Sequence, residues 1–168
     1  VGLAYGNSTQ LPYVKQFFAG GSNSIRAFPA RGIGPGDYQS KDETSSLYID
    51  QSGDIKLEAS LEYRRHIYGI FNGAIFLDGG NVWLVNEDTE RPGGILDFAN
   101  FYGDVAIGTG AGIRMDFSYF VFRFDWAFPL KKPYIEASNG WVVQDIDFSS
   151  RKWRKENIIL NIGIGYSF

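Results

Sequence analysis

The chain of 168 residues has no cysteine, a single histidine and a single methionine. The lack of cysteine excludes a disulfide scaffold, a thiolate zinc site and a cysteine nucleophile. Long apolar runs are also missing, because no stretch approaches the ~20 residues of a membrane-spanning helix. The formal net charge is −3, whereas proteins that bind nucleic acid neutralise phosphates with basic residues. We therefore expect no nucleic-acid partner.

Glycine and aromatic residues, in contrast, are abundant. The chain contains 21 glycines, 14 phenylalanines, 10 tyrosines and 4 tryptophans, and its glycine share is roughly double the usual 7%. Charged residues make up 21% of the chain, so the composition is not that of a disordered protein. The length suits one domain. Residues 1–6 already have the pattern of the end of a strand, and we expect a segment of a longer protein.

Apolar residues alternate with polar or small residues in five segments, and this period of two predicts β-strands. In residues 120–128, for example, four phenylalanines and Trp126 share one face, whereas Arg123 and Asp125 share the other. The segments are close in length to the 9–11 residues of a tilted strand that crosses a bilayer. They comprise residues 56–64, 71–83, 105–116, 120–128 and 158–168.

The connections between these segments alternate in length. Residues 65–70 and 117–119 are short, whereas 7–54, 84–103 and 131–156 are long. Short turns at one rim and long loops at the other are typical of an outer-membrane barrel. A soluble antiparallel sandwich is the alternative, since its strands alternate as well. Aromatic rows backed by glycine, arginine and aspartate favour lipid on one side and a polar lumen on the other.

The sequence therefore predicts an all-β fold, a transmembrane antiparallel β-barrel segment in the bacterial outer membrane. Residues 7–54 are expected to form a long extracellular loop, and residues 55–168 the last five strands. Five or six strands are fewer than the eight of the smallest such barrels. Unpaired backbone groups are costly in hydrocarbon, so we expect further strands from the N-terminal part of the same protein or from another copy.

The long loop carries a specific motif. The run GGSNSIRAF at residues 20–28 resembles the sixth extracellular loop of the BamA/TamA superfamily, the bacterial surface antigen family, and is more similar to its TamA-type members. Residues 61–64 (LEYR) and 76–83 (FLDGGNVW) resemble the two strands that follow this loop. The core of the loop motif is a hydrophobic residue, arginine, glycine and an aromatic residue. Here these positions are Ile25, Arg26, Ala27 and Phe28.

The resemblance implies the last part of a 16-stranded barrel, with the long loop folded into the lumen and Arg26 paired with Glu62 and Asp78. The alternation independently places both carboxylates on the inward faces of adjacent strands. From the residues alone, Arg26 could instead be a solvated loop cation. Ala27 departs from the family glycine, and it would be strained if this position required a positive φ angle.

The C-terminal end fits the outer-membrane C-terminal signal, and the family resemblance makes it the strand at a lateral seam. Gly163 and Gly165 either soften this seam, because glycine weakens a strand, or make room for the loop. The residues that form the signal and the seam strand are Asn161, Gly163, Gly165, Tyr166 and Phe168.

The family resemblance implies a barrel that helps to insert or assemble outer-membrane proteins or envelope components through this seam. A two-partner secretion-type transporter and a passive porin or adhesin are the alternatives. We expect no enzymatic activity, cofactor or metal. The expected partners are outer-membrane lipid and lipopolysaccharide, substrate outer-membrane proteins, and N-terminal strands and periplasmic repeats of the same protein. The basic run at residues 151–155 either touches lipopolysaccharide or is solvated, and the sequence favours the second.

Overall fold

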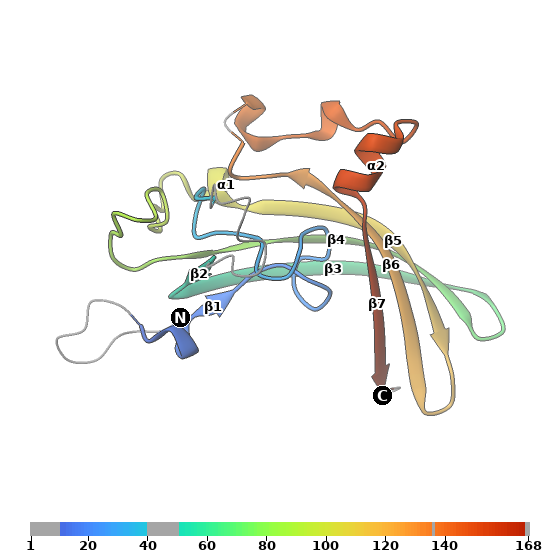
Figure 1. Ribbon diagram of the computed structural model, residues 1–168. Helices are drawn as coiled ribbons and strands as arrows, with labels where there is room; N and C mark the ends of the chain where they lie inside the picture. Colours follow the sequence, from blue (N-terminus) through green and yellow to red (C-terminus); the bar gives the residue numbers. More distant parts are fainter. Residues whose placement is uncertain (1–10, 40–50, 136, 167–168) are drawn as a thin grey trace.

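The computed structural model describes residues 11–39, 51–135 and 137–166 (Figure 1). The strand end predicted at residues 1–6 and the terminal Phe168 lie outside the described residues. The main body is a five-stranded antiparallel sheet in which neighbouring strands are consecutive in the sequence. Its strands are β3 (Ile55–Tyr68), β4 (Phe71–Trp83), β5 (Ala106–Asp116), β6 (Phe120–Lys131) and β7 (Ile159–Tyr166).

The connection between β3 and β4 is shorter than the alternation predicts. The expected turn at residues 65–70 is wrong, because Arg65 still pairs with Gly73 and the strand continues to Tyr68. The side chains of Arg65 and His66 are exposed on this continuation of the strand. Gly69 has a φ of 55°, a left-handed conformation that glycine adopts without steric cost.

The two faces of the sheet differ in exposure. One face presents large apolar side chains such as Leu61 and Ile164, which are 72% and 70% exposed. On the opposite face Phe76 and Asp78 are buried. The predicted alternation is therefore present in the structure, and the exposed apolar face has the character of a lipid-facing surface.

The long connection before β3 is held against the buried face. Its ends meet in a short antiparallel ladder between β1 (Phe17–Phe18) and β2 (Ser52–Gly53). Between them, Ala19 forms a bridge with Ile33, so the described part of this connection is folded rather than extended. The connection therefore brings the residues of the arginine motif to the sheet.

Short helices occur in the long connections, where the sequence predicts only loops. They are η1 (Tyr13–Lys15), α1 (Phe101–Asp104), η2 (Ala137–Gly140), η3 (Val143–Asp145) and α2 (Arg151–Asn157). The Ser150 hydroxyl accepts a 3.3 Å hydrogen bond from the backbone N–H of Trp153 and caps α2. At seven residues, α2 is too short for a hydrophobic period to identify it. Within the described ranges, no helix has both the length and the apolar character needed to cross a membrane.

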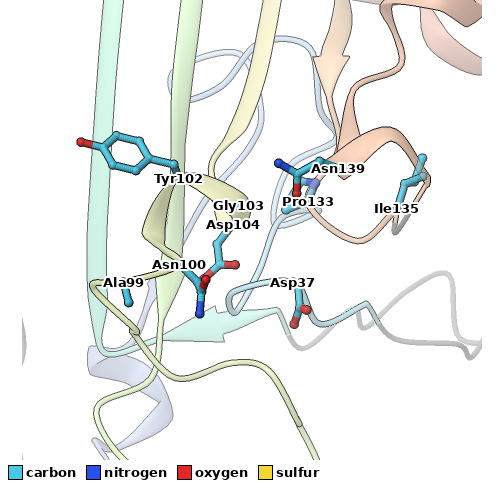
Figure 2. A pocket seen from close by; sticks show the side chains of 9 residues that line it. All are labelled: Asp37, Ala99, Asn100, Tyr102, Gly103, Asp104, Pro133, Ile135 and Asn139. Atoms are coloured by element: carbon cyan, nitrogen blue, oxygen red, sulfur yellow. The ribbon is translucent and has the colours of Figure 1, made fainter.

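A hollow of about 370 Å³ opens among the long connections (Figure 2). Its lining includes Asp37, Asn100, Asp104 and Asn139. Burial raises the pKa of Asp104 above its ordinary value, although the indole N–H of Trp83 donates to its carboxylate at 3.1 Å. In the part of the chain that the structure describes, no three acidic or histidine side chains are grouped to hold a metal ion.

Candidate functional site

The loop tip at residues 21–28 is a compact unit closed by its own backbone. The N–H of Gly21 donates to the carbonyl of Phe28 at 2.9 Å, and the N–H of Phe28 donates to the carbonyl of Ile25 at 3.1 Å. Gly20 and Gly21 both have a φ of 97°, which few other residues adopt. A side chain at Gly20 would also place its Cβ 2.2 Å from the carbonyl oxygen of Pro29.

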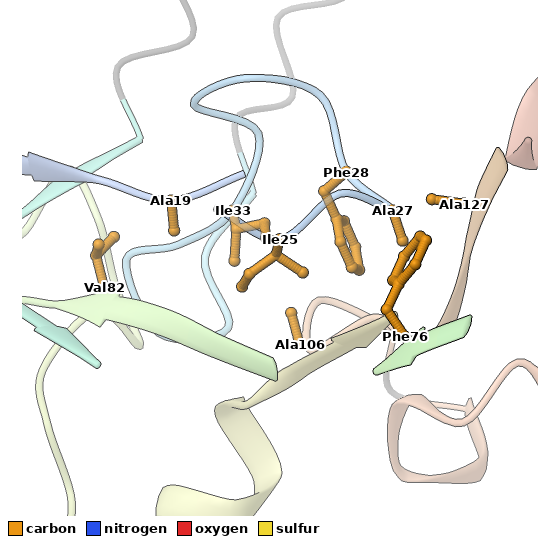
Figure 3. Close-up of a cluster of buried hydrophobic side chains, with 9 residues drawn as sticks. All are labelled: Ala19, Ile25, Ala27, Phe28, Ile33, Phe76, Val82, Ala106 and Ala127. Atoms are coloured by element: carbon orange, nitrogen blue, oxygen red, sulfur yellow. The ribbon is translucent and has the colours of Figure 1, made fainter. Parts of the chain in front are cut away.

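Apolar side chains fix this tip on the inner face of the sheet (Figure 3). Ile25 and Phe28 are 1% and 2% exposed and pack in one cluster with Phe76 of β4. Burial of side chains of this size stabilises the docked loop by about 1.5–3 kcal/mol each. The full cluster consists of Ala19, Ile25, Ala27, Phe28, Ile33, Phe76, Val82, Ala106 and Ala127.

Arg26 extends from the tip to the carboxylate of Asp78. Its Nε and Nη2 atoms donate to the two oxygens of Asp78 at 2.7 and 2.8 Å, the two-pronged geometry that suits a guanidinium. The hydroxyl of Ser60 also donates to Asp78 at 2.6 Å. Arg26 is 4% exposed, which excludes the alternative of a solvated loop cation.

Glu62 and the ring of Phe76 complete the surroundings of the guanidinium. Nη1 of Arg26 donates to Glu62 at 2.5 Å, and Cζ lies 3.5 Å from the centroid of the Phe76 ring. Burial alone would lower the pKa of Arg26, but the hydrogen bonds and charges of Asp78 and Glu62 outweigh it and raise the pKa above its ordinary value. The guanidinium therefore remains charged in this buried position.

Further charged residues, which the sequence analysis did not identify as site residues, also join this network. Arg114 of β5 donates to Glu62 at 3.1 Å and also bonds Asp125 of β6, which is fully buried. Arg64 donates to the other oxygen of Glu62 at 2.6 Å. Each of these carboxylates therefore faces more than one cation, since Asp125 also lies 3.7 Å from Arg26.

Glycines on β5 provide the space that this arrangement needs. A Cβ at Gly108 would lie 2.2 Å from the Cβ of Ala27, and one at Gly112 would lie 2.0 Å from Asp125. Among the described non-glycine residues, positive φ angles occur only at Arg31, Ser138 and Asn139. Ala27 therefore has an ordinary backbone conformation, and its methyl group fits against a glycine of the facing strand.

The edge strand β7 also contacts the loop tip. The side-chain amide of Asn161 donates to the carbonyl oxygen of Arg26 at 2.9 Å. A Cβ at Gly163 would lie 3.1 Å from the guanidinium of Arg123, whose Nη2 in turn donates to the carbonyl of Ser22 at 3.0 Å. Gly163 thus faces a side chain that holds the loop.

The other predicted seam residues, Gly165 and Tyr166, follow near the end of the same strand. A Cβ at Gly165 would meet no heavy atom within 4 Å, so this glycine is not needed for space. Tyr166 ends β7 and pairs through its backbone with Phe120. The structure therefore brings Asn161 into contact with Arg26, whereas a role for Gly165 and Tyr166 in the seam stays a prediction.

Comparisons with known proteins agree with the motif. A family model described as the Omp85 superfamily domain matches residues 1–168. The chain is also similar to a protein of Neisseria meningitidis serogroup B (strain ATCC BAA-335 / MC58), "Outer membrane protein assembly factor BamA", with 25% identity over 154 residues. That match covers 79% of this chain and 19% of the relative, so the chain spans about a fifth of the relative's length.

Proposed function

The chain belongs to the Omp85 superfamily and is part of a bacterial outer-membrane protein, and on this premise we propose that it helps to insert other proteins into that membrane. In this proposal Arg26 holds the loop inside the barrel, with the long connections at the cell surface. The strand β7 provides a lateral seam at which a substrate strand pairs. No covalent step is required, because backbone hydrogen bonds template the incoming strand.

The hydrogen bond between Asn161 and the Arg26 carbonyl is the observation that carries this proposal. It joins the loop that Arg26 holds directly to the edge strand β7. Within the described residues β7 pairs only with β6, and an edge strand presents a row of backbone donors and acceptors to a further strand. The loop therefore supports the inner face of the strand on which a substrate would pair.

Gly163 has a part in this proposal as well. Its missing side chain leaves space for Arg123, which bonds the loop at Ser22. We propose that Gly163 admits the loop contact, whereas Gly165, which has no such neighbour, softens the strand. The two interpretations of the glycines then apply to different positions on the same strand.

The experiment measures insertion of a reporter outer-membrane barrel into lipid vesicles that contain the full-length protein. Asn161→Ala removes one neutral hydrogen bond, which is worth about 0.5–1.5 kcal/mol, and should slow insertion several-fold while the barrel still folds. Asn72→Ala is the control, because Asn72 also donates a side-chain hydrogen bond, to Asp116 at 2.6 Å, and its partners lie on the sheet rather than on the loop. Equal insertion rates for both variants and the wild type would contradict the proposal.

The same variants distinguish the alternative functions. A two-partner secretion-type transporter would lose export of its dedicated partner in the Asn161→Ala variant and would leave reporter insertion unchanged. A passive porin or adhesin would change in neither assay. The name of the meningococcal relative, an assembly factor, favours the insertion assay as the first measurement.

A further inference from the structure

The helix α2 lies at the rim of the sheet, directly before the edge strand (Figure 1). It ends at Asn157 and β7 begins at Ile159, so a single residue separates them. The N–H of that residue, Ile158, donates to the carbonyl of Arg154 at 3.0 Å. The orientation of α2 is therefore tied to that of β7.

Aromatic side chains seat α2 on the exposed apolar face of the sheet. Trp153 lies 6.3 Å from Phe128 and 5.1 Å from Phe148, measured between ring centroids, and Phe128 lies 5.3 Å from Phe148. Phe128 is on the same face of β6 as Trp126, which is 45% exposed. In outer-membrane barrels, aromatic side chains gathered at the end of an apolar face are typical of the boundary between lipid and water.

Three of the four basic residues of α2 lie away from these aromatic contacts, whereas the fourth, Arg154, donates to the carbonyl of Phe148 at 2.6 Å. Successive helical residues are turned by about 100°, so Arg151 and Lys155 lie roughly opposite Trp153 and one turn apart. Lys152 is at the side of the helix. All three cations are exposed, and their charged ends are thus at the level of the lipid headgroups if the aromatic seat faces lipid.

Nearby acidic residues are directed to other cations. Asp147 accepts a hydrogen bond from the hydroxyl of Ser149 and further ones from the backbone N–H groups of Ser149 and Ser150, and these bonds together with the charge of Arg154 lower its pKa. Burial lowers the pKa of Lys132, and the charge of Glu156 opposes this shift.

The cations at the exposed surface of α2 are consequently not neutralised. Among the residues that the structure describes, Arg151, Lys152 and Lys155 form no hydrogen bond or ion pair through their side chains. Three uncompensated cations on a short helix attract anions, and a phosphate group offers several oxygens to such donors.

An apolar row continues from the basic helix along the edge strand. Leu160, Ile162 and Ile164 are 53%, 60% and 70% exposed and lie on one face of β7. Across β6 their partners are Trp126, Phe124 and Phe122. The eight residues of β7 span about 26 Å along the strand at about 3.3 Å each. At a tilt of about 40° this is about 20 Å of depth, more than half of the ~30 Å hydrocarbon core, so the row covers the acyl chains of one leaflet.

We propose that this surface binds a phosphorylated glycolipid of the lipid A type in the outer leaflet. The cations of α2 hold its phosphate groups, and its acyl chains lie along the apolar row of β7. The inference rests on the outer-membrane location and on the proposed orientation, with the long connections at the cell surface. It places an ordered lipid beside the strand that we assign to the seam.

The experiment titrates the detergent-solubilised full-length protein with bis-phosphorylated lipid A and measures the bound fraction by native mass spectrometry. The variant Arg151→Gln/Lys152→Gln/Lys155→Gln should bind about a hundredfold more weakly, because each cation near an anionic surface contributes about fivefold. Lipid A stripped of its phosphates should bind the wild type as weakly as intact lipid A binds this variant.

A charge-preserving variant, Arg151→Lys/Lys152→Arg/Lys155→Arg, is the matched control and should bind within about twofold of the wild type. Equal affinity of the glutamine variant and the wild type would overturn the proposal. So would full binding of the dephosphorylated lipid, or complete competition by millimolar inorganic phosphate, because either result removes the need for a lipid-borne phosphate. Phosphatidylglycerol at matched charge should bind more weakly, and equal binding would overturn the assignment to lipid A.

Discussion

Replacement of Arg26 by methionine removes the central charge of the network and keeps much of the side-chain volume. Asp78 then loses both guanidinium bonds and keeps the Ser60 hydroxyl and the backbone N–H of residue 26. Glu62 retains Arg64 and Arg114 and is less affected. Breaking a buried ion pair by removing one partner costs about 3–5 kcal/mol. We assign most of this cost to Asp78, whose side chain is 1% exposed.

This cost should appear as release of the loop from the sheet. A loss of about 3 kcal/mol enlarges the released population more than a hundredfold, since about 1.4 kcal/mol corresponds to a factor of ten. Trypsin cleavage after the exposed Arg31 reports this population, because a protease needs an extended segment. For the full-length protein in lipid vesicles, we expect cleavage of the Arg26→Met variant to be about a hundredfold faster than that of the wild type.

A second substitution distinguishes the effect of the unpaired buried charge on loop release from the effect of lost packing. Asp78→Asn in the Arg26→Met background leaves no charge at this buried position, so cleavage should slow again by at least tenfold. Arg65→Met is the control, because Arg65 is exposed on β3 and its loss should leave cleavage at Arg31 unchanged. The reasoning is refuted if Arg26→Met is cleaved at the wild-type rate, or if Asp78→Asn gives no recovery.

Two further predictions concern the contact between the loop and β5 and the connection that follows β4. Gly108→Val should release the loop as strongly as Arg26→Met, because its Cβ would overlap Ala27, and trypsin cleavage measures this as well. At the rim, hydrogen bonds from the Glu90 backbone and the Arg91 side chain hold the pKa of Asp88 below its ordinary value. A lowered folded pKa gives stability that is full above about pH 4 and lost as the pH falls through the folded value. Amide exchange of residues 84–95, corrected for intrinsic rates, should therefore increase in acid for the wild type but not for Asp88→Asn.

Controls for these two predictions are available in the same chain. Gly103→Ala introduces a Cβ with no heavy atom within 4 Å and should leave the loop docked. If Gly108→Val also leaves cleavage unchanged, Ala27 does not need the space at β5. If the Asp88→Asn variant retains the acid-dependent increase in exchange, a different carboxylate is responsible for it.

Much of the fold could be predicted from the sequence, because the side-chain period of a strand depends on neither register nor partners. The predicted antiparallel barrel segment and the BamA/TamA superfamily assignment are both confirmed, whereas the similarity to TamA-type members stays a prediction. The alternation also placed Glu62 and Asp78 on one face, and the structure shows both within hydrogen-bonding distance of Arg26.

The rest of the network could not be predicted, because it depends on the register between strands. Arg114 and Asp125 come from different strands and meet only because Gly112, two residues before Arg114, pairs with Asp125. A signal was nevertheless present, since both are charged residues on faces that also carry alanine and glycine. The helix α2 was missed for another reason, because only its Ser150 cap marks its start.

The contacts of Arg26 with the individual strands of the sheet differ in strength. Arg26 forms charged contacts with β3 through Glu62, with β4 through Asp78 and with β6 through Asp125. Among the described residues, its link to β7 is the neutral hydrogen bond from Asn161. A neutral hydrogen bond is worth about 0.5–1.5 kcal/mol, well below a buried charged pair. Separation of β7 from the loop therefore costs much less than release of the loop from the other strands. On this reasoning we expect the Asn161→Ala variant to free the inner face of β7 while the loop stays docked on β3, β4 and β6, so that trypsin cleavage after Arg31 remains at the wild-type rate although insertion is slowed.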